Sequence, residues 1–255
     1  MRLLDKVVVI TGAAQGIGFA TAQRMLTEGA RVVLADRSAV ALADAVTAIR
    51  AGVVLPASMT LADRLLSAVV DVTERATLDA MVRETDRCWG RIDVLVNNAG
   101  ITADARLSTM TAEQFDRVVA VNLKGVWQCT QAVLASLLAQ ADGVILNASS
   151  VVALTGNFGQ SNYAAAKAGV IAMTKTWARE LGPKGIRCNA VCPGLIDTPM
   201  LATIPPAVLE KLLERIPLHR LGRADEVAGV YAFLASNDAS YLNGAVIEVS
   251  GGIHL

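Results

Sequence analysis

The stretch KVVVITGAAQGIG, residues 6–18, joins a short β-branched run to a turn rich in glycine. Gly12, Gly16 and Gly18 lie between this predicted strand and a helical pattern that begins at residue 17. Such a turn can bring backbone N–H groups and a helix N-terminus against a pyrophosphate. A glycine turn without a ligand is the alternative interpretation, because the pattern alone is weak evidence.

The alternation of strand and helix continues along all 255 residues. Apolar β-branched runs recur at 31–35, 67–71, 92–97, 143–149, 186–192 and 245–250, and helical patterns lie between them, for example at 17–28, 74–88, 112–140, 162–181 and 224–235. Apolar strands that alternate with helices predict a parallel sheet covered on both faces. We therefore expect a single Rossmann-type doubly wound α/β domain over 1–255 with about seven strands. Its cofactor half is roughly 1–148 and its catalytic and substrate half roughly 149–255.

The composition excludes several classes of function. Lys plus Arg and Asp plus Glu are equal at 23 each, so the chain has no basic excess to hold nucleic acid. No run approaches the roughly 18 apolar residues of a membrane span. The first residues lack the features of a signal peptide, which predicts a cytoplasmic protein. The four Cys and two His lack metal-ligand spacing, which predicts neither a metal site nor a structural disulfide.

Polar or glycine-rich groups follow most of the predicted strands. In a doubly wound sheet the ligand lies outside the carboxyl ends of the strands, where the strand order reverses. The groups found there are TGAAQGIG (11–18), DR (36–37), DV (71–72), NNAG (97–100), SS (149–150) and PGLIDT (193–198). A purely structural role would not require this clustering, so the sequence predicts a binding cleft at these ends.

Asp36 ends the second predicted strand, 18 residues beyond Gly18. A carboxylate at this place can accept hydrogen bonds from the adenosine ribose hydroxyls. A 2′-phosphate there would meet a like charge, and two unit charges about 4 Å apart repel by about 4 kcal/mol at an effective dielectric of about 20. We therefore expect NAD(H) to be favoured over NADP(H). Arg37 is either a solvated side chain or a guanidinium that holds a phosphate, which would favour NADP(H).

Tyr163 and Lys167 are four residues apart in a helical pattern, so they share one face. A nearby ammonium stabilises a phenolate and lowers the pKa of the Tyr, which then exchanges protons with an alcohol or carbonyl oxygen more readily. Ser150, at the end of a strand, can donate a hydrogen bond to the same oxygen. Beside a nicotinamide, these groups would complete a site for hydride transfer.

Taken together, these motifs resemble the short-chain dehydrogenase/reductase family over essentially the whole chain. The motifs are TGAAQGIG, Asp71, NNAG, Asn122 in VNLKG, Ser150, YAAAK and PGLIDT, in the family's order. The subfamily that looks closest is the 3-oxoacyl-[acyl-carrier-protein] reductases. This similarity lies in VVALTGNFGQSNYAAAKAGV, IPLHRLGR and FLASNDASYLNG.

The resemblance implies a catalytic tetrad. Tyr163 would be the acid and base, Lys167 would bind the nicotinamide ribose and lower the Tyr pKa, Ser150 would orient the substrate, and Asn122 would hold a water that relays protons to Lys167. Ser149 competes with Ser150, but its spacing to Tyr163 fits the family less well. The implied cofactor contacts are Gly12, Gln15, Gly16, Ile17, Gly18, Asp36, Asp71, Val72, Asn98, Gly100, Tyr163, Lys167, Pro193, Gly194, Ile196 and Thr198. The implied substrate contacts are Ser150, Val152, Gln160, Tyr163, Leu195 and Met200.

The chain departs from the reductases of that subfamily in its charges. Gln15 replaces a basic residue of the glycine turn, and no Lys or Arg lies between Lys124 and Lys167. Lys184 could supply only a second docking charge. An acyl carrier protein is therefore an unlikely partner, and a hydrophobic alcohol or ketone, or a coenzyme A thioester, fits better. Residues 51–67 look about ten residues longer than usual, and either reshape the adenine side of the cleft or merely decorate it.

Two apolar segments bear on substrate and assembly. The family places a lid at about 198–218, and its apolar residues here predict a hydrophobic substrate, although ordinary helix packing would need the same residues: Met200, Leu201, Ile204, Val208, Leu209, Leu212 and Leu213. The helix around 126–141 is apolar on nearly all sides, so another subunit should cover its outer face. The family's usual homotetramer agrees.

Other functions stay open at this stage. An NADPH-dependent 3-oxoacyl-[acyl-carrier-protein] reductase is the first alternative, and a non-catalytic NAD(H)-binding sensor is one from another class. The Cys and His spacing speaks against a zinc-dependent alcohol dehydrogenase. A dehydratase, isomerase or epimerase could use the same tetrad.

Overall fold

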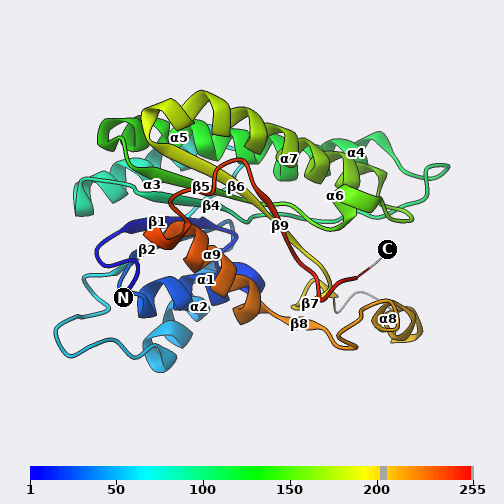
Figure 1. Ribbon diagram of the computed structural model, residues 1–255, viewed down its shortest axis with the longest axis horizontal. Helices are drawn as coiled ribbons and strands as arrows, with labels where there is room; N and C mark the ends of the chain where they lie inside the picture. Colours follow the sequence, from blue (N-terminus) through cyan, green and yellow to red (C-terminus); the bar gives the residue numbers. More distant parts are fainter. Residues whose placement is uncertain (202–205, 254–255) are drawn as a thin grey trace.

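A parallel sheet of seven strands forms the centre of the molecule (Figure 1). The computed structural model describes residues 1–201 and 206–253. The strand order is β3-β2-β1-β4-β5-β6-β9, with bounds Val7–Thr11 (β1), Arg31–Asp36 (β2), Leu65–Val69 (β3), Val94–Asn97 (β4), Gly143–Ala148 (β5), Ile186–Pro193 (β6) and Val246–Val249 (β9). A second, two-stranded sheet pairs β7 (Ile196–Asp197) with β8 (Gly222–Arg223). The single-domain α/β fold with about seven parallel strands is thus confirmed.

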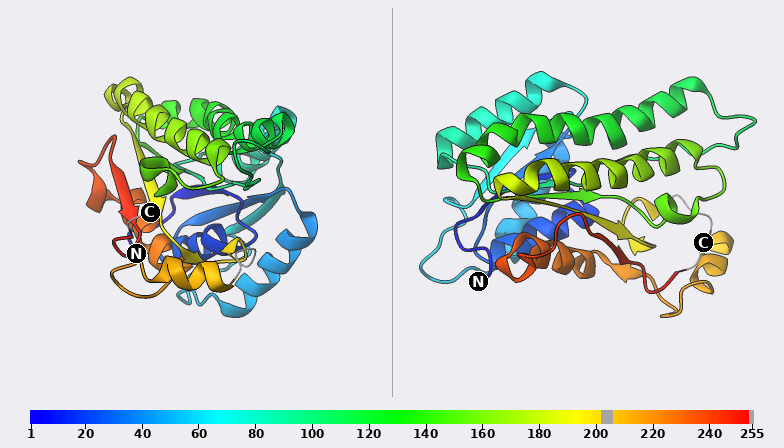
Figure 2. Two further views of the ribbon diagram at one scale, coloured as in Figure 1. Left: turned by 90° about the vertical axis from the view of Figure 1, so that its right-hand side faces the viewer. Right: turned by 45° about the horizontal axis from the view of Figure 1, so that its top comes forward.

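Helices cover both faces of this sheet (Figures 1 and 2). Along β1, Val8 and Ile10 pack into one core while Val7 and Val9 pack into the other, because successive strand residues point to opposite faces. One face is covered by α1 (Gly16–Thr27), α2 (Ala39–Gly52) and α9 (Ala224–Ala235), and the other by α3 (Arg75–Trp89), α5 (Gly125–Gln140) and α7 (Ser161–Leu181). A strand buried on both faces reads as a continuous apolar run, which explains the sequence pattern.

The strand order reverses at β1, which pairs with β2 on one side and β4 on the other. The connections diverge at this point and leave a crevice beyond the carboxyl ends of the strands. The remaining helices, α4 (Ala112–Val119), α6 (Val152–Thr155) and α8 (Pro206–Leu213), lie toward this same end of the molecule (Figure 1). Within the described residues, no helix has both the length and the apolar character needed to cross a bilayer.

Two details differ from the sequence-based expectation. The third strand lies two residues earlier than 67–71, at an exposed sheet edge where apolar patterning is weak. The helical pattern at 112–140 is interrupted by a π-helical turn, Ala120–Lys124, between α4 and α5. Gly125 follows this turn, and a Cβ there would lie 2.7 Å from Val72 Cγ2, so the close approach requires glycine. In the expected lid, Ile204 lies outside the described residues.

The long connection at 51–67 lies away from the crevice. Most of it is the loop before β3, so it lies at the amino end of that strand, and the crevice is at the carboxyl end. The buried Arg64 holds the loop by donating to the Gly29 carbonyl at 2.7 Å and to Asp5 Oδ1 at 2.9 Å. This position supports the interpretation that residues 51–67 merely decorate the fold and do not reshape the adenine side of the cleft.

Candidate active site

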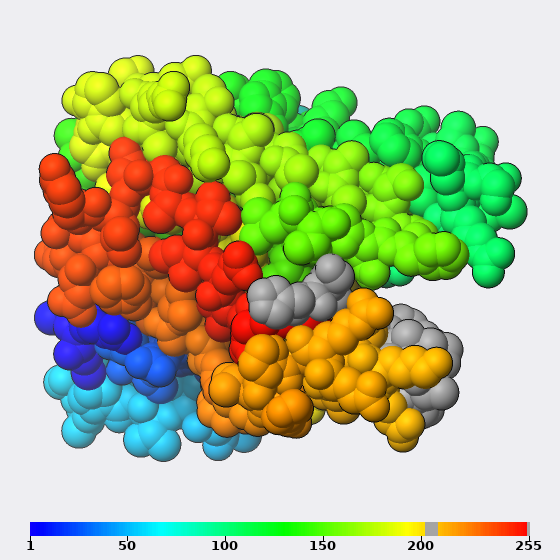
Figure 3. Space-filling view, turned by 45° about the vertical axis from the view of Figure 1, so that its right-hand side comes forward, coloured from blue at the N-terminus to red at the C-terminus, as the bar shows by residue number. Residues whose placement is uncertain are grey.

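A cleft of about 590 Å³ lies at the carboxyl ends of the strands. Figure 3 shows its side of the molecule, where the surface is hollowed between the green segments above and the orange segment of α8 below. The cleft is lined by most of the residues that the sequence singled out, namely Gly12, Gln15, Gly16, Ile17, Asp36, Asp71, Val72, Asn98, Gly100, Ser150, Tyr163, Lys167, Pro193, Gly194, Ile196, Thr198 and Met200. The fold therefore brings residues from both halves of the chain to one site.

The β1–α1 turn forms one wall of this cleft. Gly12 and Gly16 have positive φ values of 63° and 57°, a conformation that glycine adopts without strain. A Cβ on Gly18 would lie 2.3 Å from the Gly12 carbonyl oxygen, so α1 can pack this closely only with glycine. The Asn98 amide group donates to the carbonyls of Thr11 and Gly12 at 3.0 and 3.1 Å and fixes the turn.

The start of α1 can accept an anion. No side chain caps this helix, and its first turn contains no acidic residue, so its N–H groups and the positive end of its dipole face no competing carboxylate. The preceding turn lines the cleft at the same point. These features, together with the carboxylate at the end of β2, fit a dinucleotide whose pyrophosphate lies on the helix N-terminus.

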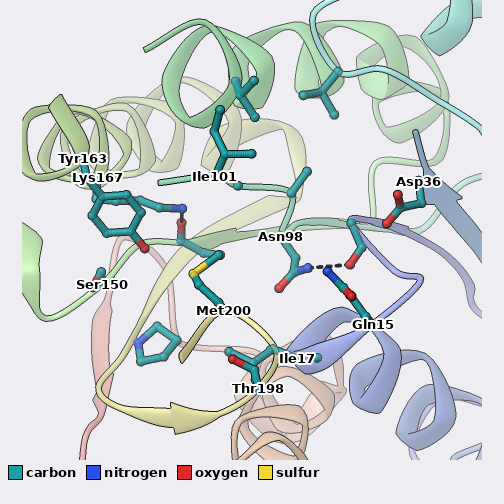
Figure 4. A pocket seen from close by; sticks show the side chains of 18 of the residues that line it. Gln15, Ile17, Asp36, Asn98, Ile101, Ser150, Tyr163, Lys167, Thr198 and Met200 are labelled. Carbon is teal, nitrogen blue, oxygen red and sulfur yellow. Dashed lines mark hydrogen bonds between the residues drawn. The ribbon is translucent and has the colours of Figure 1, made fainter. Parts of the chain in front are cut away.

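Asp36 and Asp71 lie at the far end of the cleft from Tyr163 (Figure 4 labels Asp36). The Asp36 carboxylate accepts from the backbone N–H groups of Ala14 and Ser38 at 3.2 and 3.1 Å, so its orientation is fixed. The side-chain and backbone hydrogen bonds of Thr73 hold the pKa of the Asp71 carboxyl below its usual value. Arg37 also lines this end and is exposed.

Ser150, Tyr163 and Lys167 gather at the other end of the cleft (Figure 4). Ser150 follows β5, whereas Tyr163 and Lys167 share one face of α7 at a spacing of four residues. The buried Lys167 Nζ donates to the Ala148 carbonyl at 2.7 Å and lies 5.7 Å from the centroid of the Tyr163 ring. The Ser149 hydroxyl donates instead to the Lys167 carbonyl at 2.9 Å, which leaves Ser150 as the better candidate.

Burial shifts the pKa values of Tyr163 and Lys167 in opposite directions. It raises the pKa of Tyr163 to about 12, although hydrogen bonding with Ser150 opposes the rise. It lowers the pKa of Lys167 to about 8. The effect of burial on Tyr163 thus outweighs the effects that lower its pKa, and a lowering of that pKa by Lys167 stays a prediction. Desolvation disfavours both charged forms here, and the ammonium is directed at the Ala148 carbonyl.

Asn122 lies fully buried in the π-helical turn. Its amide oxygen accepts from Ile101 N at 2.9 Å, and its amide nitrogen donates to Ile101 O at 2.8 Å. A Cβ on the neighbouring Gly100 would lie 3.5 Å from Asn122 Oδ1 and 3.6 Å from Lys167 Nζ, so the two side chains lie close together. The side-chain amide fixes the loop after β4, and the role of Asn122 in holding a water stays a prediction.

Some predicted residues do not line the cleft. Gly18 and Asn122 support it from behind, Leu195 packs beside Val151 and Ile216, and Val152 is buried in α6. Gln160 donates its amide N–H to Asp104 and accepts from Asn157, both at 2.9 Å.

Sequence reasoning missed several residues that line the cleft from α4, from the π-helical turn and from the ends of the strands. The clearest case is Arg117, Ala120 and Val121, whose helical spacing predicts a shared face, although only the fold shows that this face borders the cleft. The full set is Val70, Thr73, Ala99, Ile101, Arg117, Ala120, Val121, Ala148 and Pro199.

Comparisons with known proteins give consistent results. Residues 12–254 match the family model described as enoyl-(acyl carrier protein) reductase. A 3-oxoacyl-[acyl-carrier-protein] reductase of Thermotoga maritima is 49% identical over 99% of both chains. A (3R)-3-hydroxyacyl-CoA dehydrogenase of Mus musculus is 43% identical over 100% of this chain and 98% of its own length. The crystal structure of levodione reductase superposes with a TM-score of 0.92 at 39% identity, over 98% of both chains.

Proposed function

Because the chain belongs to the short-chain dehydrogenase/reductase family, we propose that it uses NAD(H) to interconvert a secondary alcohol and a ketone, with Tyr163 as acid and base. One observation carries the proposal. Ser150, Tyr163 and Lys167 meet at one end of a cleft whose other end holds the fixed Asp36 carboxylate. A dinucleotide extended between these ends would bring its nicotinamide beside the Tyr phenol.

The chemistry follows from the groups at the catalytic end. The nicotinamide would supply or accept the hydride. Ser150 would donate a hydrogen bond to the substrate oxygen and align it, and the Tyr163 phenol would give or take the proton on that oxygen. Lys167, which shares a helix face with Tyr163, would hold the nicotinamide ribose and stabilise the phenolate when it forms. Asn122 would keep the loop beside Lys167 in place.

The relatives support 3-oxoacyl and 3-hydroxyacyl compounds as substrates, since two of them are named for these groups. Apolar side chains support an apolar substrate, because Met200 lines the cleft and Leu154 and Phe158, before α7, are exposed. We infer a hydrophobic alcohol or ketone, or a 3-hydroxyacyl or 3-oxoacyl thioester. Exposed Trp127 on α5 and Phe115 on α4 support a homotetramer that covers these helices.

An NADPH-dependent 3-oxoacyl-[acyl-carrier-protein] reductase is the second candidate. Two observations favour it, the exposed Arg37 at the adenine end and the 49% identity to the Thermotoga enzyme of that name. The absence of Lys and Arg between Lys124 and Lys167 weighs against docking of an acidic carrier protein. The fixed orientation of the Asp36 carboxylate weighs against binding of the 2′-phosphate of NADP(H).

The proposal is tested by absorbance at 340 nm. NAD⁺ and NADP⁺ are each offered with secondary alcohols and with 3-hydroxyacyl-CoA thioesters, and NADH and NADPH with the matching ketones and thioesters. We expect turnover with NAD(H). Tyr163→Phe should abolish turnover but leave NADH binding, followed by fluorescence titration, within about threefold, because only the proton donor is lost. Full turnover by that variant would refute the mechanism, and NADH binding without any turnover would favour the sensor.

A further inference from the structure

Two loop segments at the catalytic end lie side by side in opposite directions. One is residues 103–106, in the loop after β4, and the other is residues 158–162, which lead into α7. Four contacts join them in order: Asn162 Nδ2 donates to Ala103 O at 3.0 Å, Gln160 Nε2 to Asp104 Oδ2 at 2.9 Å, Ala105 N to Gly159 O at 2.9 Å, and the Arg106 guanidinium lies 5.5 Å from the Phe158 ring centroid. We call this arrangement the loop clamp.

The clamp is tied directly to the residue before the Tyr. Asn162 is fully buried, and its amide oxygen accepts from Tyr163 N at 2.7 Å while its amide nitrogen also donates to Gln114 O at 3.1 Å. Both polar atoms of the Gln160 side-chain amide are hydrogen-bonded, because Asn157 Nδ2 also donates to Gln160 Oε1 at 2.9 Å. The first turn of α7 therefore keeps a fixed position relative to Asp104.

Asp104 has no ion pair within residues 1–201 and 206–253. Its hydrogen-bond partner is the neutral Gln160 amide, and the nearby Arg106 guanidinium lies on the Phe158 ring. Asp104 is exposed as a residue, but partial burial of its carboxyl raises the pKa above the usual value, and the hydrogen bond from Gln160 opposes the rise. The clamp holds this carboxylate near the start of the helix that carries Tyr163. A negative charge is thus kept beside the catalytic end without a cation to neutralise it.

We propose that Asp104 is a positioning residue of this site: it fixes Gln160 in the loop clamp, and its negative charge opposes ionisation of the Tyr163 phenol. This inference rests on the proposed function, because it assigns Asp104 a part in the proton transfer assumed there. In the clamp, each segment supplies one partner to every contact.

The other titratable groups around Tyr163 do not supply this charge. Lys167 on α7 is the cation, and Cys192 on β6 and Tyr231 on α9 are buried and neutral at pH 7 because burial raises the pKa of both. Burial is the main cause of the raised Tyr163 pKa, and negative charge on Asp104 or Cys192 would add to the rise. Of these two groups only Asp104 is charged at neutral pH, so it is the one that can act there.

The consequence is a bias toward the protonated phenol. A protonated Tyr is ready to give its proton to a ketone oxygen, whereas oxidation of an alcohol needs the phenolate. In water, a unit charge about 8 Å from a titrating group changes the pKa of that group by about 0.4 unit, and the effect is larger where the group is desolvated by burial, as the Tyr163 phenol is. Removing the Asp104 charge should therefore move the pH profile of oxidation toward lower pH by at least a few tenths of a unit.

The test uses three variants of the full-length protein. Asp104→Asn keeps an acceptor oxygen for Gln160 and removes the charge. Asp104→Ser removes the charge and draws the acceptor oxygen back from Gln160 by shortening the side chain, and Asp104→Glu keeps the charge. Profiles of kcat/KM against pH are recorded for alcohol oxidation. We expect the Asn and Ser variants to shift by at least a few tenths of a unit to lower pH, the Glu variant to keep the wild-type midpoint, and the shift to shrink in about 1 M salt, where the Debye length is about 3 Å.

Asp63→Asn is the matched control, because Asp63 is also an exposed carboxylate held by a neutral side chain, Thr60, at 2.6 Å, but lies in the loop before β3. Its profile should match the wild type. The titration of the Tyr163 phenol can also be followed without turnover, by ¹⁹F NMR of protein labelled with 3-fluorotyrosine, whose phenol is more acidic than that of tyrosine. The chain has three Tyr, and Tyr163→Phe assigns the signal.

The two readouts separate the possible failures. If the Tyr163 signal titrates at lower pH in Asp104→Asn, the inference holds even where no substrate turns over and the proposed function fails. If neither Asp104→Asn nor Asp104→Ser moves the titration or the profile, or if both move to higher pH, the inference is overturned. A loss of kcat/KM at every pH with an unchanged midpoint would leave Asp104 a purely structural role and would also overturn it.

Discussion

Asp36→Asn should change the cofactor preference of this protein. The wild-type carboxylate is fixed by two backbone N–H groups, so it cannot turn away from a 2′-phosphate. The full repulsion of about 4 kcal/mol at about 4 Å and an effective dielectric of about 20 is reduced here, since the side chain is only half-buried. A third of that value, about 1.4 kcal/mol, corresponds to a factor of about ten. The ratio of kcat/KM for NAD⁺ to that for NADP⁺ should therefore fall at least about tenfold.

The ratio of the two kcat/KM values isolates the effect of the Asp36 charge. An Asn side chain loses one of the two backbone hydrogen bonds, but that loss weakens binding of both cofactors alike and cancels. Arg37→Gln is the matched control, because it removes the neighbouring cation, and it should weaken use of NADP⁺ more than use of NAD⁺. Initial rates at 340 nm give kcat/KM with each cofactor for the wild type and both variants. A ratio in Asp36→Asn within twofold of the wild type would refute the reasoning from Asp36.

Two further predictions concern packing and titration. Gly18→Ala should destabilise the protein by about 1–3 kcal/mol in urea unfolding, because the new Cβ would lie 2.3 Å from the Gly12 carbonyl oxygen. Gly229→Ala in α9, where the nearest atom would be 3.9 Å away, should be neutral or stabilising by up to about 1 kcal/mol; equal losses in both would contradict the argument. Lys167→Met should change the pH dependence of stability, since burial lowers the pKa of Lys167 from its usual 10.5 to about 8 on folding. Between pH 8 and 10.5 the unfolded wild-type chain binds more protons at Lys167 than the folded protein does, so the stability of the wild type rises with pH. The free energy of unfolding of the wild type minus that of the variant should therefore increase over this range. A decrease would show that folding does not lower the pKa of Lys167.

Most of the site follows from local patterns in the chain. The apolar run of β1 and the glycines after it predict a strand, a turn and a helix N-terminus in that order, and these are local features. The spacing of Tyr163 and Lys167 likewise places both on one face of α7. The third strand was displaced in the prediction because β3 is an exposed edge strand, where burial imposes little pattern.

The contributions of Asn98 and Gln160 could not be predicted in this way. Both were expected to contact a ligand, yet the Asn98 amide nitrogen bonds to the β1–α1 turn and Gln160 bonds to the loop clamp. Such partners lie tens of residues away along the chain, and no local spacing records them. The same holds for Arg117, which reaches the cleft only because α4 lies over it.

The sequence alone therefore determined the order of the strands and helices, the glycine turn, and the pairing of Tyr163 with Lys167, because each depends on neighbours within a few residues. Tertiary structure decided which of these groups share a cleft and how each is protonated. The pKa values of Tyr163 and Lys167 depend mainly on burial, which arises only when α7 packs against the ends of β5 and β6. Desolvation is a property of the packed molecule, and no stretch of sequence carries it.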